Sequence, residues 1–313
     1  MALAMQRKTG IDSSGLVATY QSLLASLYGD ELPLASLTDT ADVIFHAEGP
    51  SVRHHAATSG AVAWLCEEAE RRLRQLTSAA LRWTGSAGDA AARDLRVLMN
   101  GVAPGSLYIG FSVDSAARVA EQDAGASPLL WTDDNDVLGK ARAAISQLVL
   151  VPRFVDAETV NAGITDAISD PGLRDATLMA AYHLSPTGKR GIHTIEISAP
   201  RGAEPAAAFT NRERVVLRET AVRRPMLKKA QRGSFVGELR EVDLDAHRFQ
   251  LRNVPTVGTL RCALQGMTVE LARQHIGMGV RVTGDYEVDV EGRPGLMIVD
   301  EIGPFQRQTS LSI

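Results

Sequence analysis

Five β-like runs, with one helix-like segment between the third and the fourth, fill the C-terminal part of the chain. This pattern limits the fold more than any other feature. In the first four runs the apolar residues fall on one face of the expected strand, which is typical of strands with one buried face. The strands are expected at 234–242, 247–252, 258–264, 279–290 and 296–302, and the helix at 268–275. Gly277, Gly279 and Gly284 supply the bends that a small barrel needs, so the pattern predicts a five-stranded β-barrel.

The order of these elements resembles that of the OB fold. The resemblance covers only this C-terminal segment and rests on topology rather than on a sequence motif. OB barrels often bind single-stranded nucleic acid across their second and third strands, through stacked aromatic side chains and basic residues. The resemblance therefore implies a recognition surface on the outside of the barrel.

Such a surface needs basic residues and stacked aromatic side chains. Only the basic residues are expected on the outside of this barrel. Five arginines are expected there: Arg240, Arg248, Arg252, Arg261 and Arg281. The aromatic residues Phe235, Phe249 and Tyr286 are expected on the core side. Base stacking contributes about 1–3 kcal/mol per base, so this arrangement favours a protein partner over nucleic acid.

A basic segment, 223–232, precedes the barrel and contains five basic residues and no acidic one. We expect the domain boundary here, with the barrel at 231–313. We also expect Arg223, Arg224, Lys228 and Lys229 to contribute to partner binding.

Helical periodicity dominates the remainder of the chain. The clearest helix is expected at 58–81, with further helices at 14–28, 137–150, 157–169 and 172–184. Pro33 is expected to follow the end of the first helix. Asp156 and Asp170 are the expected caps of the last two helices, and Thr210 with Glu213 forms a capping-box pattern before another short segment. Strands are expected at 42–46, 107–113 and 192–198.

These elements predict an α+β fold. A mixed helix and strand domain is expected at 1–125, and a helical region at 126–230 that either packs with the first domain or is separate from it. The net charge of −4 and the isoelectric point of about 6.0 are unlike those of most dedicated nucleic-acid-binding proteins.

The sequence also indicates the cellular setting. No secretory signal or membrane-spanning run is expected, which favours the cytoplasm and excludes a membrane partner. Cys66 and Cys262 lie in separate apolar-periodic segments and are expected to be free, buried thiols.

No complete catalytic motif is present in the sequence. The best candidates for an unrecognised enzyme site are His46, Glu48, His54 and His55, with His183 and His193 as distant partners. Convergence of these side chains in one cleft would favour an enzyme. Residues 185–190 (SPTGKR) lack the first glycine and the final hydroxyl residue of a phosphate-binding loop, so a plain turn is expected there. No metal site and no cofactor are expected.

These observations predict a non-catalytic accessory or regulatory protein. It is expected to bind a macromolecule, and a protein before nucleic acid, through the barrel and the basic segment. Two alternatives stay open: a protein that binds single-stranded nucleic acid, and an enzyme with a His/Glu site.

Overall fold

The fold is described from a computed structural model. It covers residues 19–20, 22–23, 26, 32–53, 56–81, 95–103, 106–115, 132–200, 205–223, 225–244, 247–264 and 268–305. The prediction of a mixed α+β chain is confirmed. Among the described residues, no helix combines the length and the apolar character needed to cross a bilayer.

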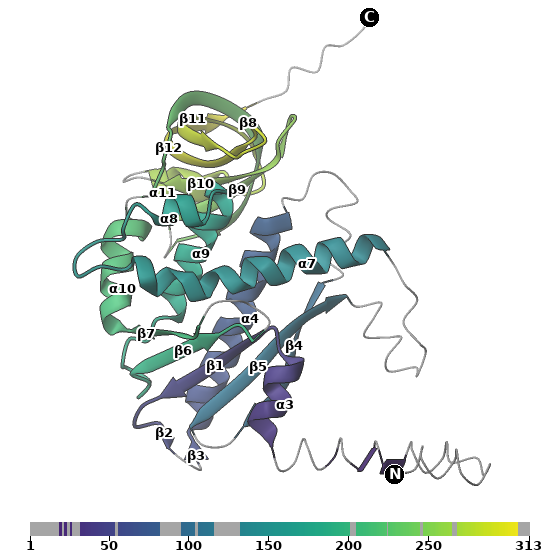
Figure 1. Cartoon of the computed structure of the whole chain (residues 1–313). Helices are drawn as coiled ribbons and strands as arrows, with labels where there is room; N and C mark the ends of the chain where they lie inside the picture. The colour runs from purple at the N-terminus through teal and green to yellow at the C-terminus, as the bar shows by residue number, and fades with distance from the viewer. Residues whose placement is uncertain are drawn as a thin grey trace, which may run out of the picture.

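An antiparallel sheet in the order β4-β5-β1-β6-β7 forms the centre of the first part of the chain (Figure 1). Its strands are β1 (Val43–Glu48), β4 (Leu95–Ala103), β5 (Leu107–Ser115), β6 (Thr194–Ser198) and β7 (Ala207–Thr210). The short strands β2 (Val52–Arg53) and β3 (Ala56–Ala57) pair with each other beside it. Alternate residues of β1, such as Val43 and Phe45, are fully buried against the helices, as the period of a strand requires.

Helices cover both faces of this sheet. The main core lies between the sheet and α4, α7 and α9, whereas α3 covers part of the opposite face through Leu37. The helices are α3 (Pro33–Thr40), α4 (Ser59–Leu81), α7 (Thr132–Ser146), α8 (Ile164–Ala167), α9 (Pro171–Leu184) and α10 (Asn211–Leu217). A 3₁₀ helix, Gln147–Phe154, follows α7, and a π-helical turn, Arg218–Val222, follows α10. Residues from both predicted segments, 1–125 and 126–230, belong to this one core.

Several local predictions are confirmed by the backbone and its caps. The side chain of Asp170 accepts a hydrogen bond from Leu173 N at the start of α9, and Pro171 occupies the first turn. Thr210 and Glu213 form the reciprocal capping box that begins α10. These local motifs need only neighbouring residues, which is why the sequence predicts them correctly.

Three local predictions are wrong or incomplete. Pro33 begins α3, because proline fits the first helical turn, and the helix end that it was expected to follow lies outside the described residues. The helix expected at 157–169 is reduced to α8, since a bridge between Val155 and Val160 forms a turn there. Strands β4 and β7 were not predicted from the sequence. The expected helix 14–28 lies largely outside the described residues.

The C-terminal strands form a separate hydrophobic cluster (Figure 1). The order of pairing, β10-β12-β11-β8-β9, closes because β9 also pairs with β10. The elements are β8 (Gln231–Asp243), β9 (Arg248–Val254), β10 (Gly258–Leu264), α11 (Thr268–Gln274), β11 (Gly279–Val288) and β12 (Pro294–Pro304). All pairs are antiparallel except β10 with β12.

Candidate functional site

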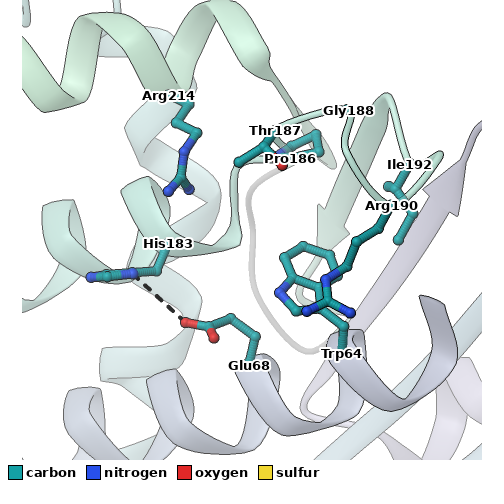
Figure 2. A pocket seen from close by; sticks show the side chains of 9 residues that line it. All are labelled: Trp64, Glu68, His183, Pro186, Thr187, Gly188, Arg190, Ile192 and Arg214. Atoms are coloured by element: carbon teal, nitrogen blue, oxygen red, sulfur yellow. Dashed lines mark ion pairs between the residues drawn. The ribbon is translucent and has the colours of Figure 1, made fainter. Parts of the chain in front are cut away.

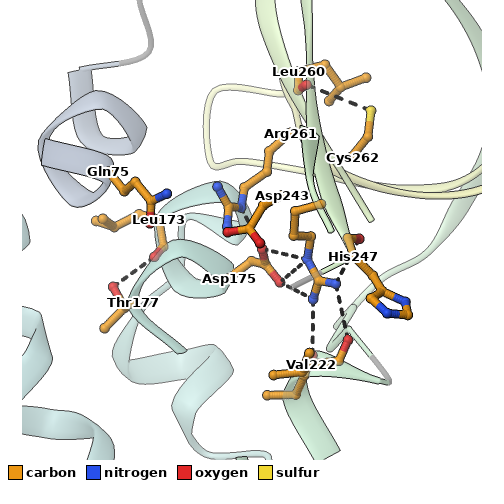
Figure 3. A network of polar contacts seen from close by, with 12 residues as sticks. Gln75, Leu173, Asp175, Thr177, Val222, Asp243, His247, Leu260, Arg261 and Cys262 are labelled. Carbon is orange, nitrogen blue, oxygen red and sulfur yellow. Dashed lines mark hydrogen bonds and ion pairs between the residues drawn. The ribbon is translucent and has the colours of Figure 1, made fainter. Parts of the chain in front are cut away.

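Buried ion pairs join the barrel to α9 (Figure 3). Arg248 of β9 donates through Nη2 to Asp175 Oδ1 at 2.8 Å, and Arg261 of β10 donates through Nε to Asp175 Oδ2 at 2.5 Å. Arg248 also donates to the carbonyls of Val222 and Ala221. Burial raises the pKa of Asp175, but the charges of Arg248 and Arg261 outweigh it and lower the pKa to about 2. The carboxylate therefore stays charged inside the protein.

A second buried pair lies next to the first. Arg174 of α9 donates to Glu287 of β11 at 2.6 Å, and Glu287 also accepts a hydrogen bond from the backbone N of Lys228 at 2.8 Å. Arg174 donates as well to the carbonyl of Met226. The basic segment is therefore fixed between α9 and the barrel by its backbone.

These ion pairs hold two of the residues that were predicted to bind a partner inside the molecule. Arg248 points outward from the barrel, as expected, but it is only 2% exposed because Asp175 of α9 and the carbonyls of Ala221 and Val222 surround its guanidinium group. Arg261 is half-buried by the same helix. Both guanidinium groups are used within the molecule, so neither belongs to an exposed binding surface.

The other predicted partner-binding residues have varied surroundings. Arg224 lies outside the described residues, Lys229 is exposed, and the guanidinium of Arg281 lies 5.3 Å from the ring centre of Phe305. Four side chains pair with nearby carboxylates: Arg223 with Glu219, Lys228 with Asp166, Arg240 with Glu238, and Arg252 with Glu241. The carboxylates offset these positive charges locally.

Two exposed apolar side chains lie in the turn between α11 and β11, where sequence reasoning predicted none. Ile276 is 51% exposed and Met278 is 53% exposed. Phe305 lies beside them, because its backbone N donates to Gly279 O at 2.9 Å. Arg281 and Phe305 line a shallow depression that continues from this point over β11 and β12. We call Ile276, Met278, Arg281 and Phe305 the barrel patch.

A serine, a histidine and a glutamate meet on the sheet. His46 Nδ1 lies 3.1 Å from Glu196 Oε2, and His46 Nε2 lies 2.5 Å from Ser106 Oγ. The β-ladder explains part of this arrangement, since His46 is directly opposite Glu196 on one side and Tyr108 on the other. The imidazole stacks on Tyr108 with ring centres 4.0 Å apart.

The predicted His/Glu candidates converge only in part. His46 Nε2 lies 3.6 Å from Glu48 Oε1, so this pair does come together. His193 has an exposed side chain, although its backbone N donates to Glu48 O. His54 and His55 lie outside the described residues. Ser106 and Glu196 had no signal in the sequence, because only strand pairing brings them to His46.

His183 belongs to a different site, a hollow between α4, α9 and α10 (Figure 2). Its Nδ1 lies 3.8 Å from Glu68 Oε1. Burial lowers the pKa of His183 to about 3, and the charge of Arg72 acts in the same direction while Asp243 opposes it. The imidazole is therefore neutral at physiological pH.

The remaining reactive groups have ordinary surroundings. Cys262 is buried, and burial raises the pKa of its thiol well above the usual range. Cys66 is partly buried, and burial raises its pKa as well. Within the part of the chain that the structure describes, no three His, Cys, Asp or Glu side chains are grouped so as to hold a metal ion.

Neither a protein-family model nor a curated protein matches this chain.

Proposed function

We propose that this protein is a non-catalytic accessory or regulatory factor that binds another protein through the barrel patch. The observation that carries the proposal is the exposure of Ile276 and Met278 beside Phe305 and Arg281. Methionine, aromatic residues and arginine are enriched in protein–protein interfaces. Large apolar side chains that cluster on a surface are typical of interaction sites.

We further infer that the C-terminal strands form an OB-type barrel. The order of pairing, the parallel pair of β10 with β12, and the position of α11 between β10 and β11 support this inference. The nucleic-acid face of an OB barrel comprises its second and third strands. These are β9 and β10 here, and α9 packs against them through Asp175. This favours a protein partner over single-stranded nucleic acid.

The chemistry of the patch indicates the kind of partner. Ile276, Met278 and Phe305 favour an apolar side chain, and Arg281 favours a carboxylate next to it. We therefore expect a partner surface that presents an apolar side chain flanked by an acidic residue.

Affinity capture with a matched pair of variants tests the proposal. The tagged full chain is expected to retain a stoichiometric protein from a nuclease-treated native lysate. Met278→Asp places a charge in the centre of the patch and is expected to abolish this capture. Val290→Asp is the control, because Val290 is 85% exposed in the turn between β11 and β12, at the other end of β11.

Two outcomes would contradict the proposal. Equal capture by Met278→Asp and Val290→Asp would show that the patch is not the binding surface. Loss of all retained material on nuclease treatment would instead favour nucleic-acid binding.

The Ser106, His46 and Glu196 cluster favours a second candidate function, acyl transfer or ester hydrolysis. With Nδ1 protonated toward Glu196, His46 Nε2 is placed to accept the proton of the Ser106 hydroxyl. Ser106 is then the expected nucleophile. A fluorophosphonate reagent is expected to label Ser106, and Ser106→Ala or His46→Asn is expected to abolish labelling. Ser112→Ala, in the strand β5 that Ser106 immediately precedes, is expected to retain it. Labelling that persists in Ser106→Ala excludes this function.

A further inference from the structure

The hollow of Figure 2 has a volume of about 120 Å³ and lies among segments far apart in the sequence. Trp64 and Glu68 come from α4, Arg214 comes from α10, and Thr187 and Arg190 come from the turn between α9 and β6. The turn is the SPTGKR segment that resembles a phosphate-binding loop only faintly. We call this site the arginine hollow.

Two arginines of the hollow make contacts with rings and backbone rather than with carboxylates, among the described residues. Arg190 lies over the ring of Trp64, 6.0 Å from its centre. Arg214 lies 4.3 Å from the ring centre of Tyr182 and donates to the carbonyls of Tyr182 and Ser185. Both guanidinium groups therefore keep a full positive charge at the hollow.

The acidic residue that lines the hollow is paired with an arginine outside it. Glu68 Oε1 accepts a hydrogen bond from Arg72 Nε at 2.6 Å, so its charge is offset by an arginine outside the hollow. His183 is neutral and adds no charge. Arg190 and Arg214 therefore supply the positive charge of the hollow, beside a Glu68 carboxylate that is already paired with Arg72.

A neutral donor and an apolar wall complete the site. Thr187 Oγ1 accepts a hydrogen bond from Lys189 N at 3.3 Å, which leaves the hydroxyl proton for a ligand. Trp64 and Ile192 form an apolar side of the hollow. Guanidinium groups and hydroxyls are the groups that bind phosphate oxygens in proteins, and the apolar side suits a carbon skeleton.

We propose that the arginine hollow binds a small organic phosphate between Arg190 and Arg214, with its carbon part against Trp64 and Ile192. The volume limits the ligand to a phosphate that carries one small carbon group, no larger than a single ring, since sites for drug-sized ligands have roughly 300–1,000 Å³. This binding site is independent of the barrel patch and of the Ser106 cluster.

Calorimetric titration of the full chain with phenyl phosphate tests the proposal. Wild type is expected to show saturable binding, tighter than that of inorganic phosphate because the ring contacts Trp64. Arg190→Gln is expected to weaken binding by about tenfold or more, which is the effect of losing one charged hydrogen-bond donor. Arg190 is the residue to change because its contact within the described chain is with a ring, so the fold does not depend on its hydrogen bonds.

Arg212→Gln is the matched control. Arg212 also lies on α10 beside the hollow's Arg214, but it is paired with Glu213 at 2.9 Å and does not line the hollow. It is expected to bind phenyl phosphate as wild type does. Three results would overturn the proposal: no saturable binding to wild type, equal weakening by Arg190→Gln and Arg212→Gln, or binding of benzoate as tight as that of phenyl phosphate.

Discussion

Asp175→Asn is expected to lower the free energy of unfolding by about 3–5 kcal/mol at neutral pH, which is the cost of breaking a buried ion pair by removing one partner. The asparagine has nearly the same shape, so the loss comes from charge. The substitution leaves Arg248, whose side chain is 3% exposed, without its partner carboxylate. Urea denaturation monitored by circular dichroism measures the change.

Asp285→Asn is the control for this prediction. Asp285 lies 3.5 Å from Arg232 in an exposed pair on the barrel surface, and such pairs contribute about 0–1 kcal/mol. A triple variant, Asp175→Leu with Arg248→Met and Arg261→Met, is expected to recover most of the stability, because an apolar set replaces the buried charges. If Asp175→Asn is as stable as Asp285→Asn, the buried pairs do not hold the barrel to α9.

The same carboxylate predicts how stability changes with pH. The pKa of Asp175 falls from 3.8 to about 2 on folding, so the folded state favours the charged form. This contribution, about 2 kcal/mol, is fully present above the unfolded pKa and is lost as the pH falls through 4 toward 2. In Asp175→Asn this part of the acid dependence is expected to be absent.

Gly284→Ala is expected to destabilise the barrel by about 3 kcal/mol or more, because overpacking against backbone atoms cannot be relieved by a rotamer change. A Cβ at this position would lie 1.9 Å from the carbonyl oxygen of Ile298 and 3.1 Å from Val299 Cα. The register of β11 against β12 shifts between Thr283 and Gly284, and this irregularity brings the two backbones close together.

Gly303→Ala in β12 is the matched control, since a Cβ there would meet no atom within 4 Å. It is expected to change the free energy of unfolding by no more than about 0.5 kcal/mol. Thermal unfolding of both variants separates the two cases. Equal stability of Gly284→Ala and Gly303→Ala would contradict the close approach of β11 to β12.

The buried ion pairs of α9 also left a trace in the sequence. Arg174 and Asp175 interrupt the apolar sequence of α9, and a charged pair at such a place indicates burial with partners from elsewhere. The partners themselves, Glu287, Arg248 and Arg261, were not predictable from the sequence. They lie far along the chain and reach α9 only when the barrel packs against it.

The sequence by itself determined the α+β class, the length of α4, the caps of α9 and α10, and the alternation of the C-terminal strands. Each depends on residues a few positions apart, where periodicity and capping chemistry act. Tertiary structure alone decided that Arg248 and Arg261 are internal, that Ser106 and Glu196 meet His46, and that Arg190 and Arg214 share one hollow. These arrangements depend on contacts between residues distant in sequence, which the local pattern of the chain does not encode.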